Sequence, residues 1–360
     1  MKKQNLRVCY FMGNISSHCP HALPLFKELG GQFVTLSNQT ALEINSQGLP
    51  AVCIDDRPDL FLGFDRKISK TINYIENNFD IVVFYELFTF SFLAYVKKIP
   101  TVFLSHGNML KTFMWPKRLK ALKKYRYLAS LSPALKEKFI HEYKINPSKL
   151  LDVGIARNDA VSKNKGDVLF SRNFLEKTNL DTNKPFISYI PTWWGISTVQ
   201  SIGLDFINNF PPNYNLLFRP HPQTPVDIIE KYQKIIDLND NMVLVDALSL
   251  EEQFDASSLL VGDLSSVVLE WILTDKPLIF IYEKNKDYRK DLHSIKEVVS
   301  FCCSINEVDV SNISSAIEKA LKINTHQETW DTVKNRAFYG YKGDSTYALV
   351  QSLKKLCAHD

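Results

Sequence analysis

The chain has 360 residues, of which 45% are hydrophobic and 23% charged, and this composition is that of a soluble globular protein large enough for two α/β domains. The formal net charge of +4 permits an anionic substrate but does not require nucleic acid as a partner. No apolar run approaches the roughly 18 residues of a membrane span. The start of the chain lacks the apolar core of a signal peptide, so we expect a cytoplasmic protein. The six cysteines form no CxxC pair, which argues against a zinc site or a disulfide framework.

Short apolar runs alternate with helical segments between Leu6 and Leu151. Runs that are apolar on both faces and separated by helices indicate a parallel sheet covered on both sides, so this part is predicted to be one doubly wound domain. The expected helices are His21–Leu29, Asp65–Asn77, Phe90–Lys97 and Pro133–Glu142. The expected strands are Val8–Phe11, Phe33–Leu36, Ala51–Ile54, Ile81–Phe84, Val102–Leu104, Tyr127–Ala129 and Leu150–Val153.

A polar stretch, Asp159–Asp181, leads into a second alternating set. The predicted fold class is therefore α/β, with two Rossmann-like, doubly wound domains facing across a cleft. We expect domains over 1–160 and 161–345, and a C-terminal helix over 346–360 that could pack back across the domain junction. The expected strands are Phe186–Ile190, Leu216–Phe218, Met242–Val245, Leu259–Val261 and Leu278–Ile281. The expected helices are Val199–Asn208, Pro225–Ile236, Ser265–Leu273, Asn312–Lys322, Thr329–Phe338 and Ser345–Leu356.

The segment Phe254–Tyr282 has the pattern of a buried strand, a loop, a helix and a second buried strand. A helix that starts after a buried parallel strand points its free N–H groups into the ligand crevice. Ser265 and Ser266 would add hydroxyl donors for an anion there, and Glu270, one turn deeper, could accept hydrogen bonds from ribose hydroxyls. In the simpler alternative, the two serines only cap the helix and Glu270 is solvated.

Polar clusters also follow other predicted strands. Because the carboxyl ends of parallel strands line the crevice of an α/β domain, five such clusters argue for a cleft shaped around phosphate chemistry. The clusters are SHGN at 105–108, GIARND at 154–159, PTWW at 191–194, RPHP at 219–222 and DLSS at 263–266.

Together with GDST at 343–346, these motifs occur in the order of a known family. The other motifs of the set are SHG at 105–107, GIARND, IPTWW at 190–194, RPHP and DLSSVVLEWILTDKPLIF at 263–280. They resemble the motifs of CDP-glycerol glycerophosphotransferases, which are the teichoic-acid primases and polymerases and related capsule polymerases. The resemblance runs from about His106 to Thr346. The pattern departs from the family's usual one at Leu264, where an aromatic residue is common, and at Glu270, where aspartate is frequent.

The resemblance implies the GT-B architecture, with the acceptor on the N-terminal domain and the CDP-alcohol on the C-terminal one. It implies transfer of an alcohol phosphate, glycerol phosphate in the first place, from CDP-glycerol or another CDP-alcohol to an acceptor hydroxyl, with release of CMP. Such transfer serves the synthesis of teichoic acid, capsule or related surface polymers. The acceptor would be a glycan or a lipid-linked molecule at the inner face of the cell membrane.

Two histidines are the candidate catalytic residues. His106 would be the general base that activates the acceptor hydroxyl, because the unperturbed pKa of histidine, about 6.5, lies near operating pH. It could equally be a turn histidine that bonds the backbone of Gly107. His221, held between two prolines, would act with Arg219 on the pyrophosphate and on the charge of the transferred phosphoryl group; the alternative is a proline-rich connecting turn.

The remaining candidates are substrate-binding residues. Arg157 could clamp a phosphate with its planar guanidinium, while Asn158 beside it binds substrate or only caps the next helix. The set is completed by Thr192, Trp193, Asp263, Ser265, Ser266 and Glu270. The positive groups could do the work of a cation, so we expect no metal and no cofactor beyond the CDP-alcohol substrate.

The segment Lys111–Tyr127 carries seven basic residues and no acidic one. If this segment forms a helix, the helix could lie on an anionic membrane surface or guide an anionic polymer, although a charge run is more often a solvated face.

Other functions remain open at this point: a GT-B glycosyltransferase, a sugar-nucleotide epimerase, or a non-catalytic two-domain protein that binds small anions.

Overall fold

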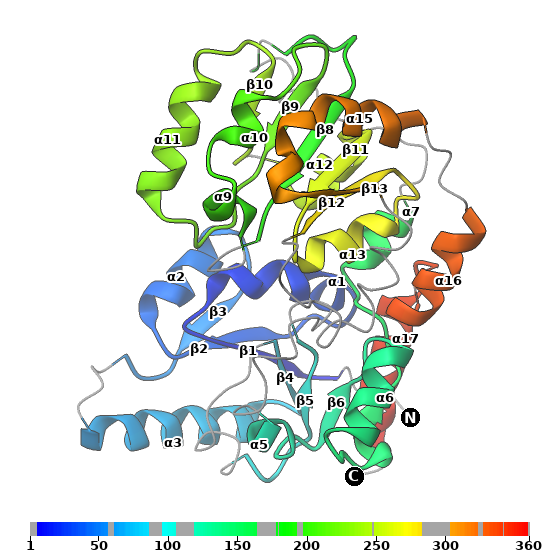
Figure 1. Cartoon of the computed structure of the whole chain (residues 1–360). Helices are drawn as coiled ribbons and strands as arrows, with labels where there is room; N and C mark the ends of the chain where they lie inside the picture. Colours follow the sequence, from blue (N-terminus) through cyan, green and yellow to red (C-terminus); the bar gives the residue numbers. More distant parts are fainter. Residues whose placement is uncertain are drawn as a thin grey trace. The chain divides into compact units, whose positions relative to one another are not determined.

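The computed structural model describes residues 6–56, 61–85, 96–105, 119–163, 178, 180–192, 197–246, 248–282, 303–322, 327–340 and 342–358. The chain divides into two compact units (Figure 1). Unit 1 comprises Met1–Asp159 and Asn335–Asp360, and unit 2 comprises Ala160–Lys334. The C-terminal segment therefore returns to the unit in which the chain began.

Unit 1 is built on a seven-stranded parallel sheet in the order β3-β2-β1-β4-β5-β6-β7. The strand β1 is buried at every position, as expected for a central strand covered on both faces. The chain winds from β1 to one edge, returns beside β1, and then winds to the other edge, which makes the unit doubly wound. The strands are β1 (Val8–Gly13), β2 (Gln32–Thr35), β3 (Ala51–Cys53), β4 (Ile81–Phe84), β5 (Thr101–Phe103), β6 (Tyr127–Ala129) and β7 (Leu150–Leu151).

Helices connect these strands and cover the sheet. Figure 1 shows α1 and α2 on one side of the sheet and α3 on the other. The C-terminal helix α17 packs against α1, and its Leu349, Val350 and Leu353 belong to the same buried core as β1. The helices of this unit are α1 (Cys19–Leu29), α2 (Asn38–Ser46), α3 (Phe61–Asn78), α5 (Leu119–Leu122), α6 (Pro133–His141) and α17 (Ser345–Ala358).

Two sequence motifs, GIARND and GDST, pack against each other in unit 1. The carboxylate of Asp159 accepts hydrogen bonds from the backbone amides of Ser345 and Thr346, at 3.0 and 2.8 Å, and so caps α17. A Cβ atom at Gly154 would lie 2.0 Å from the carbonyl oxygen of Tyr339 and 2.2 Å from Oγ of Ser345. Position 154 therefore has to be glycine for this segment to pass so closely.

Unit 2 is built on a six-stranded parallel sheet in the order β10-β9-β8-β11-β12-β13. Its strands are β8 (Phe186–Ile190), β9 (Asn215–Phe218), β10 (Met242–Leu244), β11 (Leu259–Gly262), β12 (Leu278–Tyr282) and β13 (Cys303–Asn306). Its helices are α9 (Thr198–Ser201), α10 (Asp205–Asn208), α11 (Val226–Ile236), α12 (Leu250–Ala256), α13 (Ser266–Ile272) and α15 (Ile313–Lys322). Two further helices, α7 (Asn158–Lys163) and α16 (Gln327–Ala337), contain the points where one unit ends and the other begins.

The two faces of this sheet bury different side chains. Alternate strand residues such as Ile187, Leu216 and Val261 pack in one core with residues of α10, α11 and α15. Leu217, which lies between Leu216 and Phe218 of that core, faces the other way and packs with Leu180 and Val245. The period of two is the geometry of a strand, and the burial on both faces explains why these runs are continuously apolar.

All twelve predicted strands are present, whereas some helices differ from the prediction. The single helix expected over Val199–Asn208 is two short helices, α9 and α10, because Gly203 lies between them with a left-handed φ of 62°. The strand β13 and the helices α2 and α12 are present in addition to the predicted elements. Most of the expected helix Phe90–Lys97 lies outside the described residues. Within the described part, no helix is both long and apolar enough to cross a membrane.

Candidate active site

The carboxyl edge of the unit 2 sheet is the natural place for a ligand. Strands β8 and β11 are neighbours at the centre of the sheet, and the chain winds outward from them in opposite directions. Ile190 at the end of β8 pairs with Gly262 at the end of β11. The loops that leave these two strands diverge and open the crevice in which doubly wound domains bind ligands. Two predicted site residues follow these strands: Asp263 comes directly after β11, and Thr192 is the second residue after β8.

Asp263 holds the loop that follows β8. Its Oδ1 accepts a hydrogen bond from the backbone amide of Thr192 at 2.7 Å, and its Oδ2 accepts from both the amide and the hydroxyl of Thr198, each at 2.9 Å. Asp263 is 1% exposed, so these hydrogen bonds lie in a region of low dielectric, where they are stronger than in water. Asp263, predicted to bind substrate, thus also fixes both ends of the segment 192–198.

Two members of this network, Thr198 and Tyr189, are not among the site residues predicted from the sequence. Because the Thr198 hydroxyl donates its hydrogen to Asp263, the Tyr189 hydroxyl, 2.8 Å away, must be the donor to Thr198. The ring of Tyr189 lies against Phe206 and Phe218, with centroids 4.2 and 5.4 Å apart, which keeps the phenol in place. The signal available in the sequence was Ser197-Thr198 at the start of a helix, a typical capping position.

Ser265 is the N-cap of α13, and its Oγ accepts a hydrogen bond from the amide of Val267 at 3.3 Å. Capping uses a lone pair of the oxygen and leaves the hydroxyl hydrogen to be donated, so a cap and an anion contact are compatible. Ser266 is half-buried. Glu270 is only 3% exposed, so the alternative in which Glu270 is a solvated surface residue is wrong.

Arg219 follows β9 and braces a neighbouring loop. Its guanidinium donates to the carbonyl oxygens of Leu248 and Ser249, at 2.8 and 3.3 Å, and to Oε1 of Gln253 at 3.0 Å. Gln253 in turn donates to Oγ of Ser188 at 2.9 Å, on the central strand β8. The structure therefore ties the loop before α12 to β8, the strand that precedes Thr192.

The ring of His221 has a defined orientation. Its Nδ1 accepts a hydrogen bond from the backbone amide of Gln223 at 3.1 Å, and its carbonyl oxygen accepts from the amide of Thr224 at 2.8 Å. Because Nδ1 is the acceptor, the neutral ring carries its proton on Nε2. The proline-rich turn thus presents an N–H donor, which is the form of imidazole that can stabilise a negatively charged oxygen.

The carboxyl edge of the unit 1 sheet has its own small cavity. It lies where β4 to β7 end and has a volume of about 20 Å³. Its lining includes Tyr85, Ser105 and Gly154 from these strand ends, and His21 from α1. His106, the predicted base, is the residue after Ser105 but lies outside the described residues, as does Trp193.

Arg157 and Asn158 follow β7 in the same unit. Arg157 is half-buried. Asn158 is 3% exposed, and within the described part of the chain both polar atoms of its amide are buried without a hydrogen-bond partner. A buried amide normally finds a partner, so this side chain marks a place for water or a ligand group. It does not cap α7 through its side chain.

Residues 111–118 of the basic segment Lys111–Tyr127 fall outside the described residues, which resume at Leu119. At its end, Leu122 and Tyr125 are fully buried, while Lys123, Lys124 and Arg126 are exposed. The guanidinium of Arg126 donates to the carbonyl oxygen of Lys97 at 3.0 Å.

Solved structures of other proteins have a similar fold. The chain superposes on the wall teichoic acid polymerase TagF with a TM-score of 0.66 at 16% identity, covering 99% of this chain and 90% of that one. It superposes equally on the UDP-GlcNAc 2-epimerase of Neisseria meningitidis, with a TM-score of 0.66 at 13% identity, covering 97% and 100%. The two Rossmann-like units are therefore those of the GT-B fold class.

Sequence similarity identifies a curated relative and a family. The chain is 25% identical over 193 residues to the teichoic acid glycerol-phosphate transferase of Staphylococcus aureus, and the match covers 48% of each sequence. The chain thus matches about half the length of this curated relative. Residues 73–343 match the family of CDP-glycerol:poly(glycerophosphate) glycerophosphotransferases, a range that includes every candidate site residue and most of the chain. On this match, the chain belongs to the CDP-glycerol:poly(glycerophosphate) glycerophosphotransferase family.

Proposed function

We propose that this chain transfers glycerol phosphate from CDP-glycerol to a hydroxyl group of a polymer or lipid-linked acceptor and releases CMP, in the synthesis of teichoic acid or a related surface polymer. The observation that carries the proposal is the family match over residues 73–343. The arrangement in unit 2 supports it, because the switch point between β8 and β11 brings Thr192, Asp263 and Ser265 to one edge of the sheet.

In this proposal, the donor binds at the unit 2 edge. The hydroxyl groups of Ser265 and Ser266 and the loop at Thr192 hold the phosphates, and buried Glu270 accepts hydrogen bonds from ribose or glycerol hydroxyls. Trp193 lines the pocket for the base or the alcohol. Arg157 and Asn158 contribute further contacts to the substrate.

The chemistry is phosphoryl transfer to an alcohol. His106 removes the proton from the attacking hydroxyl, and the Nε2–H of His221 stabilises the charge on the phosphate oxygens, with Arg219 adding positive charge nearby. These groups supply the positive charge that a metal ion supplies in other phosphotransferases, so the reaction is proposed to proceed without a metal. Exposed Lys123 and Lys124, with the basic residues before them, are proposed to hold the protein at the inner face of the membrane.

The experiment is incubation of the protein with CDP-glycerol, CDP-ribitol, UDP-glucose and GDP-mannose, with mass spectrometry of the products. We expect CMP only from the CDP-alcohols, and preferential thermal stabilisation by CMP over UMP and GMP. Loss of CMP release in His106→Ala, with thermal stabilisation by CMP retained, would support its role as the base. An equal response to all nucleotides would reject the proposal.

Membrane attachment is tested separately. Replacement of Lys120, Lys123 and Lys124 by glutamate should reduce binding to anionic vesicles.

A further inference from the structure

The cavity at the carboxyl edge of the unit 1 sheet has the size of a single small group. Its volume of about 20 Å³ is slightly above the roughly 10–15 Å³ that one water molecule requires. A hydroxyl group fits this space, whereas a phosphate, with four oxygens around its phosphorus, does not. The cavity is therefore of a size to hold a small group such as a hydroxyl.

Backbone strain is concentrated around this cavity. In the described part of the chain, four residues other than glycine have a positive φ, and two of them, Ser105 at 66° and Leu131 at 53°, line the cavity. A left-handed conformation is unfavourable for leucine, which has no polar side chain to bond locally. Strain of this kind persists only where the surrounding structure imposes it, and it gathers at ligand and active sites.

The polar groups of the lining match an alcohol. His21, Tyr85 and Ser105 bring an imidazole, a phenol and a hydroxyl to the cavity, and the rest of the lining is mainly apolar, with Leu104, Ile155 and Leu349. Each of the three polar groups can donate or accept a hydrogen bond, as an alcohol does. Burial raises the pKa of Tyr85 well above its usual value of 10, so the phenol remains a donor at any working pH.

We propose that the cavity lined by His21, Tyr85 and Ser105 binds one hydroxyl group of the polyol acceptor, and that this hydroxyl is not the one that is phosphorylated. The inference rests on the proposed function and adds the residues that position the acceptor. The reacting hydroxyl has to meet the phosphate of the donor, which is too large for the cavity, so the bound hydroxyl is a neighbouring one. The proposed base, His106, follows Ser105 directly in the sequence. The residue that would hold the hydroxyl is therefore the neighbour in sequence of the residue that would take the proton.

The test compares two small acceptors with CDP-glycerol as the donor. Glycerol and 1,3-propanediol both offer a primary hydroxyl, but only glycerol has the second, adjacent hydroxyl. We expect wild-type kcat/KM to favour glycerol by at least about tenfold, because a site built for a hydroxyl rejects the analogue that lacks it. Tyr85→Phe should reduce this ratio to less than about threefold. Tyr74→Phe is the matched control, since the Tyr74 hydroxyl bonds Gln32 at 2.8 Å outside the cavity, and it should keep the wild-type ratio.

A wild-type enzyme that does not distinguish the two acceptors, or a Tyr85→Phe variant that distinguishes them as well as wild type, would overturn the inference. Should Tyr85→Phe not fold, His21→Asn is the second variant and should lower the ratio in the same way. Failure of the proposed function would appear differently, as no CMP released by wild type with either acceptor. In that case saturation-transfer NMR with glycerol alone decides: a wild-type signal that Tyr85→Phe loses supports the subsite, and equal signals reject it.

Discussion

Asp159 and Ser345 lie 186 positions apart in the chain, yet Oδ1 of Asp159 accepts the backbone N–H of Ser345 at 3.0 Å. The same carboxylate accepts the amide of Thr346, so one buried side chain satisfies two of the free N–H groups that begin α17. Its negative charge also faces the positive end of the helix dipole. This contact secures the last helix of the chain to the unit formed by the first 159 residues.

Asp159→Asn should therefore destabilise unit 1 by about 2 kcal/mol, since the amide can accept only one of the two bonds and carries no charge. Urea unfolding followed by far-UV circular dichroism measures this loss. The matched control is Asp227→Asn, in the first turn of α11, whose carboxylate is 71% exposed and whose loss should change stability by less than about 0.5 kcal/mol. Equal effects of the two substitutions would contradict the capping role.

Gly154→Ala should be far more damaging than other glycine replacements. The added methyl would lie 2.0 Å from the carbonyl oxygen of Tyr339, so the segment before α17 has to move. We expect a loss above about 3 kcal/mol or failure to fold. Gly48→Ala is the comparison: its Cβ would meet no atom within 4 Å, and only its φ of 77° is unfavourable, at a cost of about 1–2 kcal/mol. Similar midpoints for the two variants would show that the close approach is absent in solution.

Thr198→Val should weaken the binding of CDP-glycerol by about tenfold, because it removes the hydroxyl that links Tyr189 to Asp263 and so loosens the loop after β8. Isothermal titration calorimetry measures the affinity. Thr274→Val is the control, since its hydroxyl also makes two hydrogen bonds in unit 2, to the carbonyl oxygen of Trp271 and from the amide of Lys276, but between α13 and the start of β12. A lower stability in both variants with unchanged affinity in Thr198→Val would assign the network to stability alone.

His221→Asn should separate the two roles of this side chain. Asparagine can accept the amide of Gln223 in place of Nδ1, so the turn should keep its stability, but it has no group at the position of Nε2. We expect kcat for CMP release to fall by about 10²–10³ with little change in unfolding midpoint. An active His221→Asn enzyme would show that the Nε2–H group does not act on the phosphate.

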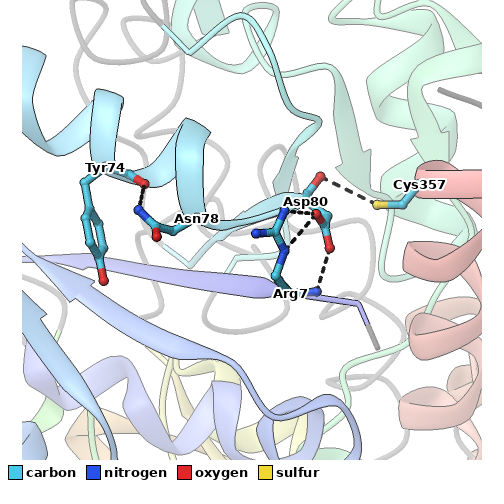
Figure 2. A network of polar contacts seen from close by, with 5 residues as sticks. All are labelled: Arg7, Tyr74, Asn78, Asp80 and Cys357. Atoms are coloured by element: carbon cyan, nitrogen blue, oxygen red, sulfur yellow. Dashed lines mark hydrogen bonds and ion pairs between the residues drawn. The ribbon is translucent and has the colours of Figure 1, made fainter. Parts of the chain in front are cut away.

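The pair formed by Arg7 and Asp80, shown in Figure 2, should make stability depend on pH in acid. Nε and Nη2 of Arg7 donate to Oδ1 of Asp80 at 3.1 and 2.6 Å, and the amide of Arg7 donates to Oδ2 at 2.9 Å. Partial burial alone would raise the pKa of Asp80, but the hydrogen bonds and charge of Arg7 outweigh it and hold the pKa below its usual value of 3.8. The folded state thus prefers the ionised carboxylate.

It follows that this contribution is fully present above the unfolded-state pKa, near 4, and is lost as the pH falls through the lower folded-state pKa. Asp80→Asn should cost up to about 1 kcal/mol at pH 7, because solvent screens this half-exposed pair. The difference from wild type should shrink below about pH 4, as measured by urea unfolding at each pH. A difference that grows in acid would have the wrong sign and reject the assignment.

The local pattern of the sequence was sufficient for the sheets. Runs such as Ile81–Phe84 and Leu259–Val261 are apolar on both faces because the strands are buried on both faces, and that pattern is visible without the fold. It also placed Thr192, His221, Asp263 and Ser265 at strand ends, where parallel strands present loops to the crevice. The same rule applied to Tyr85, which directly follows β4, would have identified the cavity in unit 1.

Only the tertiary structure decided what those side chains touch. No local pattern shows that Asp263 bonds Thr198 across 65 residues, that Arg219 braces the loop before α12, or that Asp159 caps α17. The strain at Ser105 and Leu131 is likewise absent from the sequence, because a positive φ in a residue other than glycine is imposed by packing and not by residue type. Secondary structure follows from periodicity within about 15 residues, whereas hydrogen-bond partners depend on how distant segments are brought together.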